Sequence, residues 1–406
     1  MTATVSAIRC ADYGDGLYDA VKRLLAPLGG MESFVKPGQK VLLKANLLSP
    51  APPEKAITTH PALVKVVARL VRECGGVCFV GDGPGVGTTS VAARTSGIAA
   101  AAESEGAKLL EFQETATYHN ADNRILKNID LTAHLQEMDV LITLPKCKTH
   151  CQMGFTGALK NQYGLIPGTA KGQFHFRFQN RDRLADLMID INRTAHPVLA
   201  IMDAITAMEG MGPGSGTPRH LGVLLASSDL AAVDAVACAA IHLPLTEVPV
   251  SQAAIRAGFG TSDLQNIDIV GDSLESFSVA DFKLAGTPVN IMRIVPLPGW
   301  MLRWLRRQFM PAPRINPDKC IRCGRCEDGC PVKPAAITPK ATDGKTVHDG
   351  RCIRCYCCHE FCPVKAIDLK KSLLARIVPF TALGNFGTKV LGWCCAIFFR
   401  KGGRKS

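Results

Sequence analysis

The chain has 406 residues, of which 47% are apolar, and its 47 Lys and Arg outnumber 35 Asp and Glu to give a net charge of +12. This length predicts two or three domains, and the composition is typical of a globular, soluble protein. No run of about 18 apolar residues exists, so no membrane-spanning helix is expected, and the N-terminus shows neither a secretory nor a twin-arginine signal.

The first 290 residues alternate short apolar strands with helices. We expect strands at 41–43, 77–80, 108–112, 140–144, 198–202 and 221–226, and helices at 60–74, 90–105 and 229–241. Alternation with apolar strands is typical of a parallel sheet covered by helices on both faces. The sequence therefore predicts an α/β domain with a mostly parallel sheet over residues 1–292.

Two cysteine runs with one spacing, Cys-x2-Cys-x2-Cys-x3-Cys-Pro, lie in a short internal repeat within residues 314–370. In two-cluster ferredoxins the fourth cysteine of each run serves the other cluster. We therefore predict a small α+β, ferredoxin-like domain with two [4Fe-4S] clusters. The spacing of the first run selects Cys358, and not the adjacent Cys357, in the second. The expected ligand sets are Cys320, Cys323, Cys326 and Cys362 for one cluster, and Cys352, Cys355, Cys358 and Cys330 for the other.

Other uses of these cysteines fit less well. A structural zinc site usually shows two CxxC pairs instead of two four-cysteine runs. A secreted disulfide scaffold is normally a much shorter chain, so a reducing cytoplasm is the expected setting.

The positive charge is confined to the C-terminal quarter. Residues 1–300 hold 26 Lys and Arg against 28 Asp and Glu, whereas residues 301–406 hold 21 against 7. Bound clusters with their thiolates would offset part of this excess. The remainder favours an acidic electron donor or acceptor protein, or an anionic membrane surface. Nucleic acid is not expected as a partner, because no nucleic-acid motif is present.

Two further segments flank the cluster domain. Residues 293–313 are expected to be a basic linker with one short amphipathic helix. Residues 371–406 form a tail with an apolar patch at 390–399 and a basic end. Ten apolar residues cannot cross a bilayer, so the patch either packs on the protein or lies in a membrane surface. A cytoplasmic protein, with peripheral contact at the inner face of the membrane as the alternative, is the expectation.

Polar, glycine-bearing segments follow several predicted strands of the first domain. Ligands of open α/β sheets bind beyond the carboxyl ends of the strands, and buried charges are costly unless they serve a ligand or each other. We therefore expect a ligand cleft there. Its candidate catalytic residues are Lys146, His150 and Lys160, and its candidate binding residues are Lys44, Asn46, Asp82, Asn161, Asp203 and Glu209.

Each of these segments also has a structural interpretation. The glycine-rich turn at 81–87 departs from the dinucleotide-binding fingerprint, and it is either an anion-binding loop at a helix start or a plain turn. The segment at 144–150 either holds an anionic substrate, with His150 as proton donor, or is a solvated loop. For Asp203 and Glu209 the sequence leaves three roles open: pairing with lysines, binding a divalent metal or anchoring a loop.

The segments KANLLSP, GDGPG, LPKCKTH, TGALKNQYGLIPG and DAITAMEGMGPGSG resemble the domain of unknown function 362 family, over roughly residues 38–260. Members are often fused to a two-cluster ferredoxin module, as here. The resemblance implies an iron–sulfur protein that is a reductase or an electron carrier, and it names no substrate.

Two functions follow from this combination. In the first, an external donor reduces the clusters, and an anionic small molecule held by Lys146 and Lys160 and protonated by His150 is reduced in the cleft. Such chemistry usually asks for a flavin or another cofactor, and no flavin fingerprint is visible, so a further cleft ligand would be unidentified. In the second, the chain is a non-enzymatic electron-transfer subunit that docks a larger redox complex.

Overall fold

The computed structural model describes residues 2–85, 87–167, 171, 174, 178, 180–285, 308, 310–339 and 347–372. The chain divides into two compact units, Met1–Thr287 with Asp328–Ala335, and Pro288–Glu327 with Ala336–Ser406. We call them the α/β unit and the cluster unit. The basic linker expected at 293–313 and the tail expected at 371–406 lie almost wholly outside the described residues.

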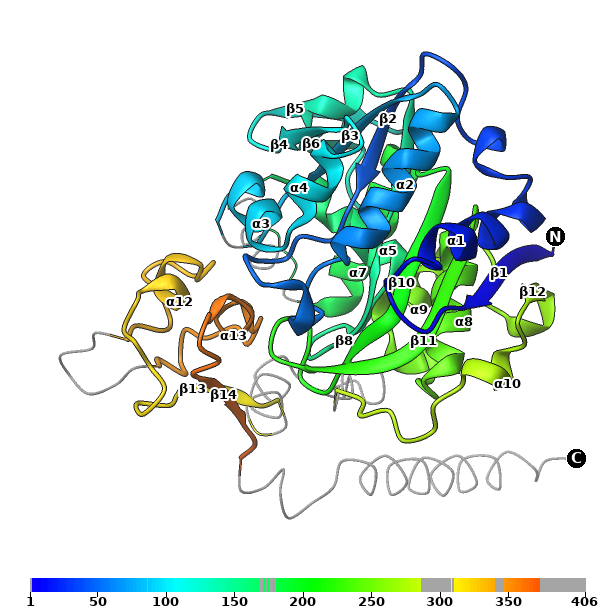
Figure 1. Cartoon of the computed structure of the whole chain (residues 1–406). Coiled ribbons are helices and arrows are strands. Elements are labelled where there is room, and N and C mark those ends of the chain that lie inside the picture. Colours follow the sequence, from blue (N-terminus) through cyan, green and yellow to red (C-terminus); the bar gives the residue numbers. More distant parts are fainter. Residues whose placement is uncertain are drawn as a thin grey trace, which may run out of the picture. The chain divides into compact units, whose positions relative to one another are not determined.

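The α/β unit is built on one large twisted sheet of mostly parallel strands, which confirms the predicted fold class (Figure 1). The main path runs in the order β12-β1-β11-β10-β7-β2-β3-β4, and β8 pairs with β10 and with β9. Antiparallel pairing is confined to β1–β11, β10–β11 and β8–β9. The strands are β1 Ala3–Arg9, β2 Lys40–Lys44, β3 Val77–Asp82, β4 Lys108–Glu111, β7 Val140–Thr143, β8 Lys146–His150, β9 Gly154–Thr156, β10 Leu199–Glu209, β11 Thr217–Ser227 and β12 Ile267–Gly271, beside a separate hairpin of β5 Thr115–His119 and β6 Asn128–Thr132.

Helices cover both faces of this sheet because successive strand residues point to opposite sides. On β2, Val41 and Leu43 pack in a core with α1, α2, α3 and α4, whereas Leu42 packs in the core that contains α5, α7, α8 and α9. The helices are α1 Leu17–Leu25, α2 Pro61–Glu73, α3 Thr89–Thr95, α4 Ile98–Glu103, α5 Ala158–Asn161, α7 Arg181–Ala195, α8 Leu230–Ala240, α9 Pro249–Ala257 and α10 Leu274–Phe277.

Three sequence predictions need correction. The single helix expected at 90–105 is two helices, because Gly97 adopts a left-handed φ of 75° between α3 and α4. The segment at 144–150 is not a loop: Lys146–His150 form β8, and all five residues are buried. The expected strand at 198–202 continues to Glu209, so Asp203 lies within β10 instead of in a loop after it.

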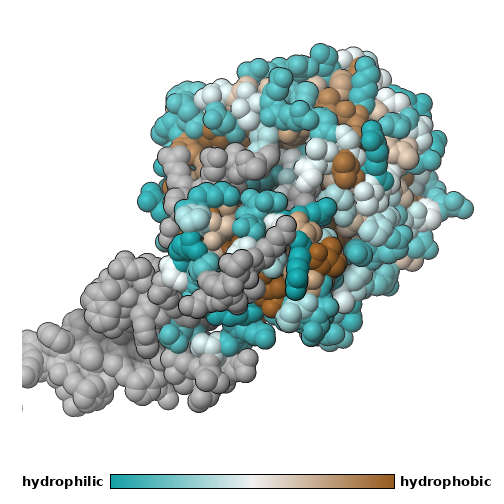
Figure 2. Space-filling view, turned by 90° about the vertical axis from the view of Figure 1, so that its left-hand side faces the viewer, coloured by the Kyte–Doolittle hydropathy of each residue, from teal (hydrophilic) through white to brown (hydrophobic). Residues whose placement is uncertain are grey.

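The cluster unit contains short elements only. Strands β13 Ala312–Ile315 and β14 Ile367–Lys370 pair antiparallel, with Ala312 opposite Lys370, and the short helices are α12 Arg325–Asp328 and α13 Cys357–Phe361. No described helix is long and apolar enough to cross a bilayer. On the face that Figure 2 shows, the apolar side chains of the described residues lie in small groups among hydrophilic ones.

Candidate functional site

A buried ion pair between Lys146 and Asp203 joins β8 to β10. The two residues are register partners in the parallel pairing of these strands, and Lys146 Nζ lies 2.8 Å from Asp203 Oδ2. The two side chains are 1% and 0% exposed. Such a pair can be buried only if further hydrogen bonds satisfy its atoms, and the neighbouring elements supply them.

Tyr13 supplies most of these bonds and was missed by the sequence analysis. Its hydroxyl donates to Asp203 Oδ1 (2.7 Å) and accepts from Lys146 Nζ (3.0 Å) and from the Thr206 backbone N–H (3.0 Å). Burial and the adjacent Asp203 carboxylate raise the pKa of Tyr13. The phenol is therefore a neutral O–H near neutral pH. Tyr13 follows β1 in a polar turn, where no spacing or periodicity singles it out.

His60 completes this cluster at the start of α2. Its backbone N–H donates to Asp203 Oδ2 (2.8 Å), and its Nδ1 accepts from the Ala62 N–H (3.3 Å) at the helix N-terminus. Its ring stacks on Tyr13 with centroids 3.6 Å apart. Burial lowers the pKa of His60, with Lys146 adding to this effect and Asp203 opposing it. His60 is thus the helix-start residue that the sequence suggested, and it also lies against the ion pair.

A second ion pair joins the carboxyl ends of β2 and β3. Lys44 Nζ lies 2.7 Å from Asp82 Oδ1, and Asp82 Oδ2 accepts from the Leu47 N–H at 2.6 Å. Burial lowers the pKa of Lys44, and Asp82 opposes that shift. Gly164 packs so closely here that a Cβ at this position would overlap Asp82 and Lys44.

Lys171 and Lys160 extend this pair toward the surface, since both are half-buried. Lys171 Nζ donates to the carbonyl of Gly83 in the glycine-rich turn. Burial lowers the pKa of Lys171 to about 8, Asp82 opposes the shift, and Lys44 and Lys160 add to it. Three ammonium groups therefore gather around one carboxylate at this strand end.

Amide side chains link the Lys44 end of this pair to a third buried lysine, Lys148. Lys148 Nζ donates to Asn46 Oδ1 and to the Ile57 carbonyl, both at 2.7 Å. Asn46 Nδ2 donates to Asn161 Oδ1 (2.9 Å), and Asn161 Nδ2 donates to the Lys44 carbonyl (3.1 Å). The structure thus brings together four of the candidate binding residues, Lys44, Asn46, Asp82 and Asn161, and Lys148 joins them.

The remaining candidates lie apart from this network. Glu209 ends β10, accepts from the Lys283 N–H (3.0 Å) and pairs with Lys283 Nζ at 3.6 Å, which is a loop anchor. His150 ends β8, and its Nδ1 accepts from the N–H groups of Gln152 (3.1 Å) and Met153 (3.2 Å). Across the described ranges, no three His, Cys, Asp or Glu side chains have the arrangement that holds a single metal ion.

A further buried carboxyl, Asp234 on α8, was also missed. It accepts from the backbone N–H groups of Ala158 (2.6 Å) and Leu159 (3.1 Å) at the start of α5. Burial raises the pKa of Asp234 to about 7, although these hydrogen bonds oppose the shift. Asp234 therefore fixes the helix that presents Lys160 and Asn161.

In the cluster unit, three predicted sulfur ligands interact electrostatically. The pKa of Cys326 is raised to about 12, first by burial and further by Cys320 and Cys362. These are three of the four cysteines assigned to one cluster, although Cys362 comes from the other run. The Arg322 N–H donates to Cys320 Sγ (3.4 Å) and the Ala366 N–H to Cys362 Sγ (3.0 Å). Such hydrogen bonds to ligand sulfurs tune cluster potentials, so these residues fit an iron–sulfur cluster.

Comparisons with known proteins find one family match in the α/β unit and another over the two cysteine runs. Residues 41–239 match the family "Domain of unknown function (DUF362)", and residues 312–363 match a 4Fe-4S dicluster domain. A thylakoid-associated protein of Synechocystis sp. is 35% identical over 260 residues, which cover 64% of this chain and 80% of that protein.

Similarity to solved structures is weaker. The lactate racemase apoprotein of Thermoanaerobacterium thermosaccharolyticum matches with a TM-score of 0.35 and 13% identity, over 56% of this chain and 54% of that one. A Thermotoga maritima protein matches with a TM-score of 0.33 and 15% identity, over 52% and 56%. The chain thus spans about half the length of each of these structures.

Proposed function

We propose that this chain, which belongs to the DUF362 family and carries a 4Fe-4S dicluster domain, is a reductase that passes electrons to an anionic small molecule bound in its α/β unit. Iron–sulfur cluster binding, and the electron transfer that such domains perform, follow from the family match. Two clusters, held in the crossed ligand sets described above, are part of the proposal, as is the substrate.

The observation that supports an anionic substrate is the electrostatic grouping of Lys44, Lys160 and Lys171 near the carboxylate of Asp82. Lys44 is buried in its ion pair, whereas Lys160 and Lys171 are half-buried. A bound anion would reduce the repulsion among the three ammonium groups and raise the pKa of Lys171. We therefore assign substrate contact to Lys160 and Lys171, with Asn161 and the turn around Gly83 as neighbours.

We assign the supply of protons for a reduction to β8, which carries Lys146 and His150. His150 Nδ1 accepts two N–H groups, so in its neutral form the proton is on Nε2, from which the ring donates. Lys146 and His150 remain in the proposal as the proton-supplying side of the site.

The test uses anaerobic full-length protein with its clusters reduced by dithionite. Reoxidation of the clusters is followed by visible absorbance while a panel of small carboxylates and phosphate esters is added. We expect at least one anion to reoxidise the clusters, and Lys160→Met and Lys171→Met to slow this reaction at least tenfold with the iron content unchanged. Lys65→Met, an exposed lysine on α2, is the matched control. No reoxidation by any member of the panel would contradict the proposal.

The second candidate is a non-enzymatic electron-transfer subunit at a membrane surface. It is favoured by the name of the thylakoid-associated relative and by the basic excess of residues 301–406. In that case the full chain would sediment with vesicles that contain anionic lipid but not with neutral ones, and Lys160→Met would leave electron transfer to the partner complex unchanged.

A further inference from the structure

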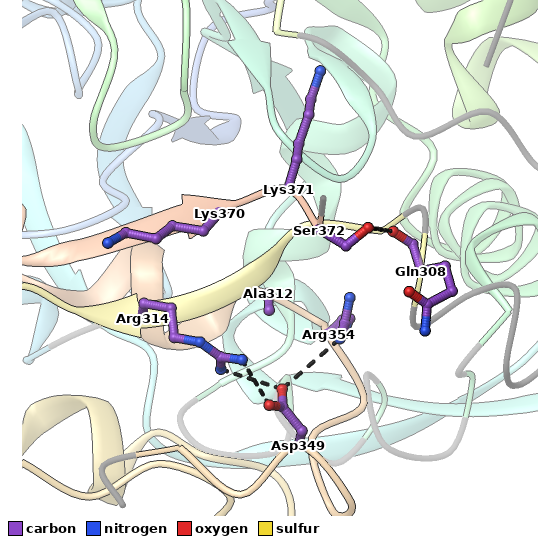
Figure 3. Close-up of a pocket in the computed structure, with 8 residues that line it drawn as sticks. All are labelled: Gln308, Ala312, Arg314, Asp349, Arg354, Lys370, Lys371 and Ser372. Carbon is purple, nitrogen blue, oxygen red and sulfur yellow. Dashed lines mark hydrogen bonds and ion pairs between the residues drawn. The ribbon is translucent and has the colours of Figure 1, made fainter. Parts of the chain in front are cut away.

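The cluster unit contains a pocket of about 370 Å³ that neither ligand set uses (Figure 3). Its walls are β13, the end of β14 and the loop of the second cysteine run. A volume of this size falls within the range of small-molecule sites. The residues that line it are Gln308, Ala312, Arg314, Asp349, Arg354, Lys370, Lys371 and Ser372.

The pocket is strongly cationic. Four of its side chains are basic and one is acidic, which gives a net formal charge of +3. Arg314 Nη1 and Nη2 lie 3.2 and 2.6 Å from the two oxygens of Asp349, and Arg354 Nη2 lies 3.8 Å from Asp349 Oδ1. One carboxylate thus lies between two guanidinium groups, and Figure 3 shows both of them pointing toward it.

The two cysteine runs differ at this point, although they are repeats of each other. Arg322 and Arg354 occupy the same position in the sequence Cys-Ile-Arg-Cys, and both have a left-handed backbone with φ of 54° and 55°. Arg322 is exposed and lies outside the pocket, whereas Arg354 is only 7% exposed and lines it.

The surrounding chain holds Arg354 in this position. Its Nη1 donates to the Met310 carbonyl, and the hydroxyl of nearby Tyr356 donates to the Pro311 carbonyl at 3.0 Å. Burying a guanidinium is costly unless it meets acceptors. Arg354 of the second run is therefore a fixed cationic side chain in the wall of the pocket, whereas the corresponding Arg322 of the first run is exposed and lies outside it.

We propose that this pocket binds a compact, multiply charged oxyanion of the phosphate or polycarboxylate class, and that the bound anion lowers the reduction potential of the cluster held by the second run. Guanidinium groups favour such oxyanions because they bind them with two parallel hydrogen bonds. The ligand must carry at least two charges, since Asp349 already supplies one carboxylate to Arg314 and Arg354.

Coupling to the cluster follows from the position of Arg354. It lies between the predicted ligands Cys352 and Cys355 in the sequence Cys-Ile-Arg-Cys. Negative charge near a cluster opposes the addition of an electron. The anion should therefore bind more tightly to the oxidised protein, and by reciprocity its binding lowers the potential. A tenfold difference in affinity corresponds to a shift of about 59 mV for a one-electron couple.

The experiment uses the anaerobic full-length protein with its clusters intact. Binding of pyrophosphate and of citrate is measured by calorimetry at constant ionic strength. Pyrophosphate represents the phosphate class of oxyanions, and citrate represents the polycarboxylate class. We expect one of them to bind, and the double variant Lys370→Gln/Lys371→Gln to weaken its affinity at least tenfold. Both lysines are exposed, so this variant should fold. Arg322→Gln is the matched control and should bind like the unmodified protein.

A redox titration followed by paramagnetic resonance tests the coupling. With saturating ligand, one of the two centres should move by about −59 mV for a tenfold preference, and the shift should be absent in the double variant. The proposal is overturned if neither anion binds, if Arg322→Gln weakens binding as much as the double variant, or if binding leaves both potentials unchanged. Binding of an acidic peptide without binding of either small anion would also overturn it, in favour of a protein-docking surface.

Discussion

Replacing Asp203 by asparagine removes one charge from the most completely buried ion pair of the α/β unit. Lys146 is 1% exposed and would be left next to a neutral amide. The Tyr13 hydroxyl would lose a carboxylate acceptor at 2.7 Å. Removing one partner of a buried pair typically costs about 3–5 kcal/mol, because the other charge is left uncompensated. We expect a loss of that size in the free energy of unfolding.

The assay is urea unfolding of the full chain with its clusters, followed by far-ultraviolet circular dichroism. Asp281→Asn is the matched control, because Asp281 pairs with Arg219 at a similar distance of 2.6 Å but is 76% exposed. An exposed pair of this kind contributes about 0–1 kcal/mol. The difference between the two variants in the free energy of unfolding therefore measures the effect of burial, separately from the effect of losing an ion pair.

A double-mutant cycle with Lys146→Met completes the test. Once Asp203→Asn has removed the carboxylate, the additional loss of Lys146 should cost little, since it also removes the uncompensated charge. The size of the coupling energy should then be close to the cost of Lys146→Met alone, about 3–5 kcal/mol by the same argument. If Asp203→Asn costs no more than Asp281→Asn, or if the two buried changes add without coupling, this account of the ion pair is wrong.

Two further predictions concern Asp234 and the crossed ligand sets. Because burial raises the pKa of Asp234 from its ordinary value of 3.8 to about 7 in the folded protein, its contribution to stability is fully present below pH about 4 and declines up to pH about 7. The free energy of unfolding of the unmodified chain, relative to Asp234→Asn, should thus fall by about 4 kcal/mol between pH 4 and 8, and parallel stability curves would contradict this. Cys362→Ala should lower the iron content and abolish the paramagnetic signal of the cluster that contains Cys320, whereas Cys357→Ala should change neither. Equal losses in both variants would refute the assignment of Cys362.

The elements that the sequence predicted correctly are those whose residues are uniformly apolar. Val41–Leu43 lie in β2, and the apolar run that starts at Val140 is β7, because strands buried on both faces need apolar side chains at every position. The helix at 60–74 was equally clear, since Pro61 suits a first turn and His60 caps it.

The elements that the sequence did not predict are those stabilised by distant polar partners. Lys146–His150 contain two lysines and a histidine, a composition typical of an exposed loop, yet the segment is a buried strand. Asp203 lies 57 residues from Lys146 in the sequence, and Tyr13 lies 190 residues from Asp203. A polar strand can be buried only when such partners are present, and sequence spacing does not reveal them.

The same partners decide which lysines are available to a ligand. Buried charges are costly unless they serve a ligand or each other, and in the structure Lys44 pairs with Asp82 and Lys146 with Asp203. These pairs are already compensated, so replacing them tests stability before it tests binding. Lys160 and Lys171 are half-buried, and the pKa of Lys171 is lowered to about 8 first by burial and further by Lys44 and Lys160. An anion that enters this site would reduce the repulsion that Lys44 and Lys160 exert on Lys171, and this gain is the physical reason to look for a substrate there.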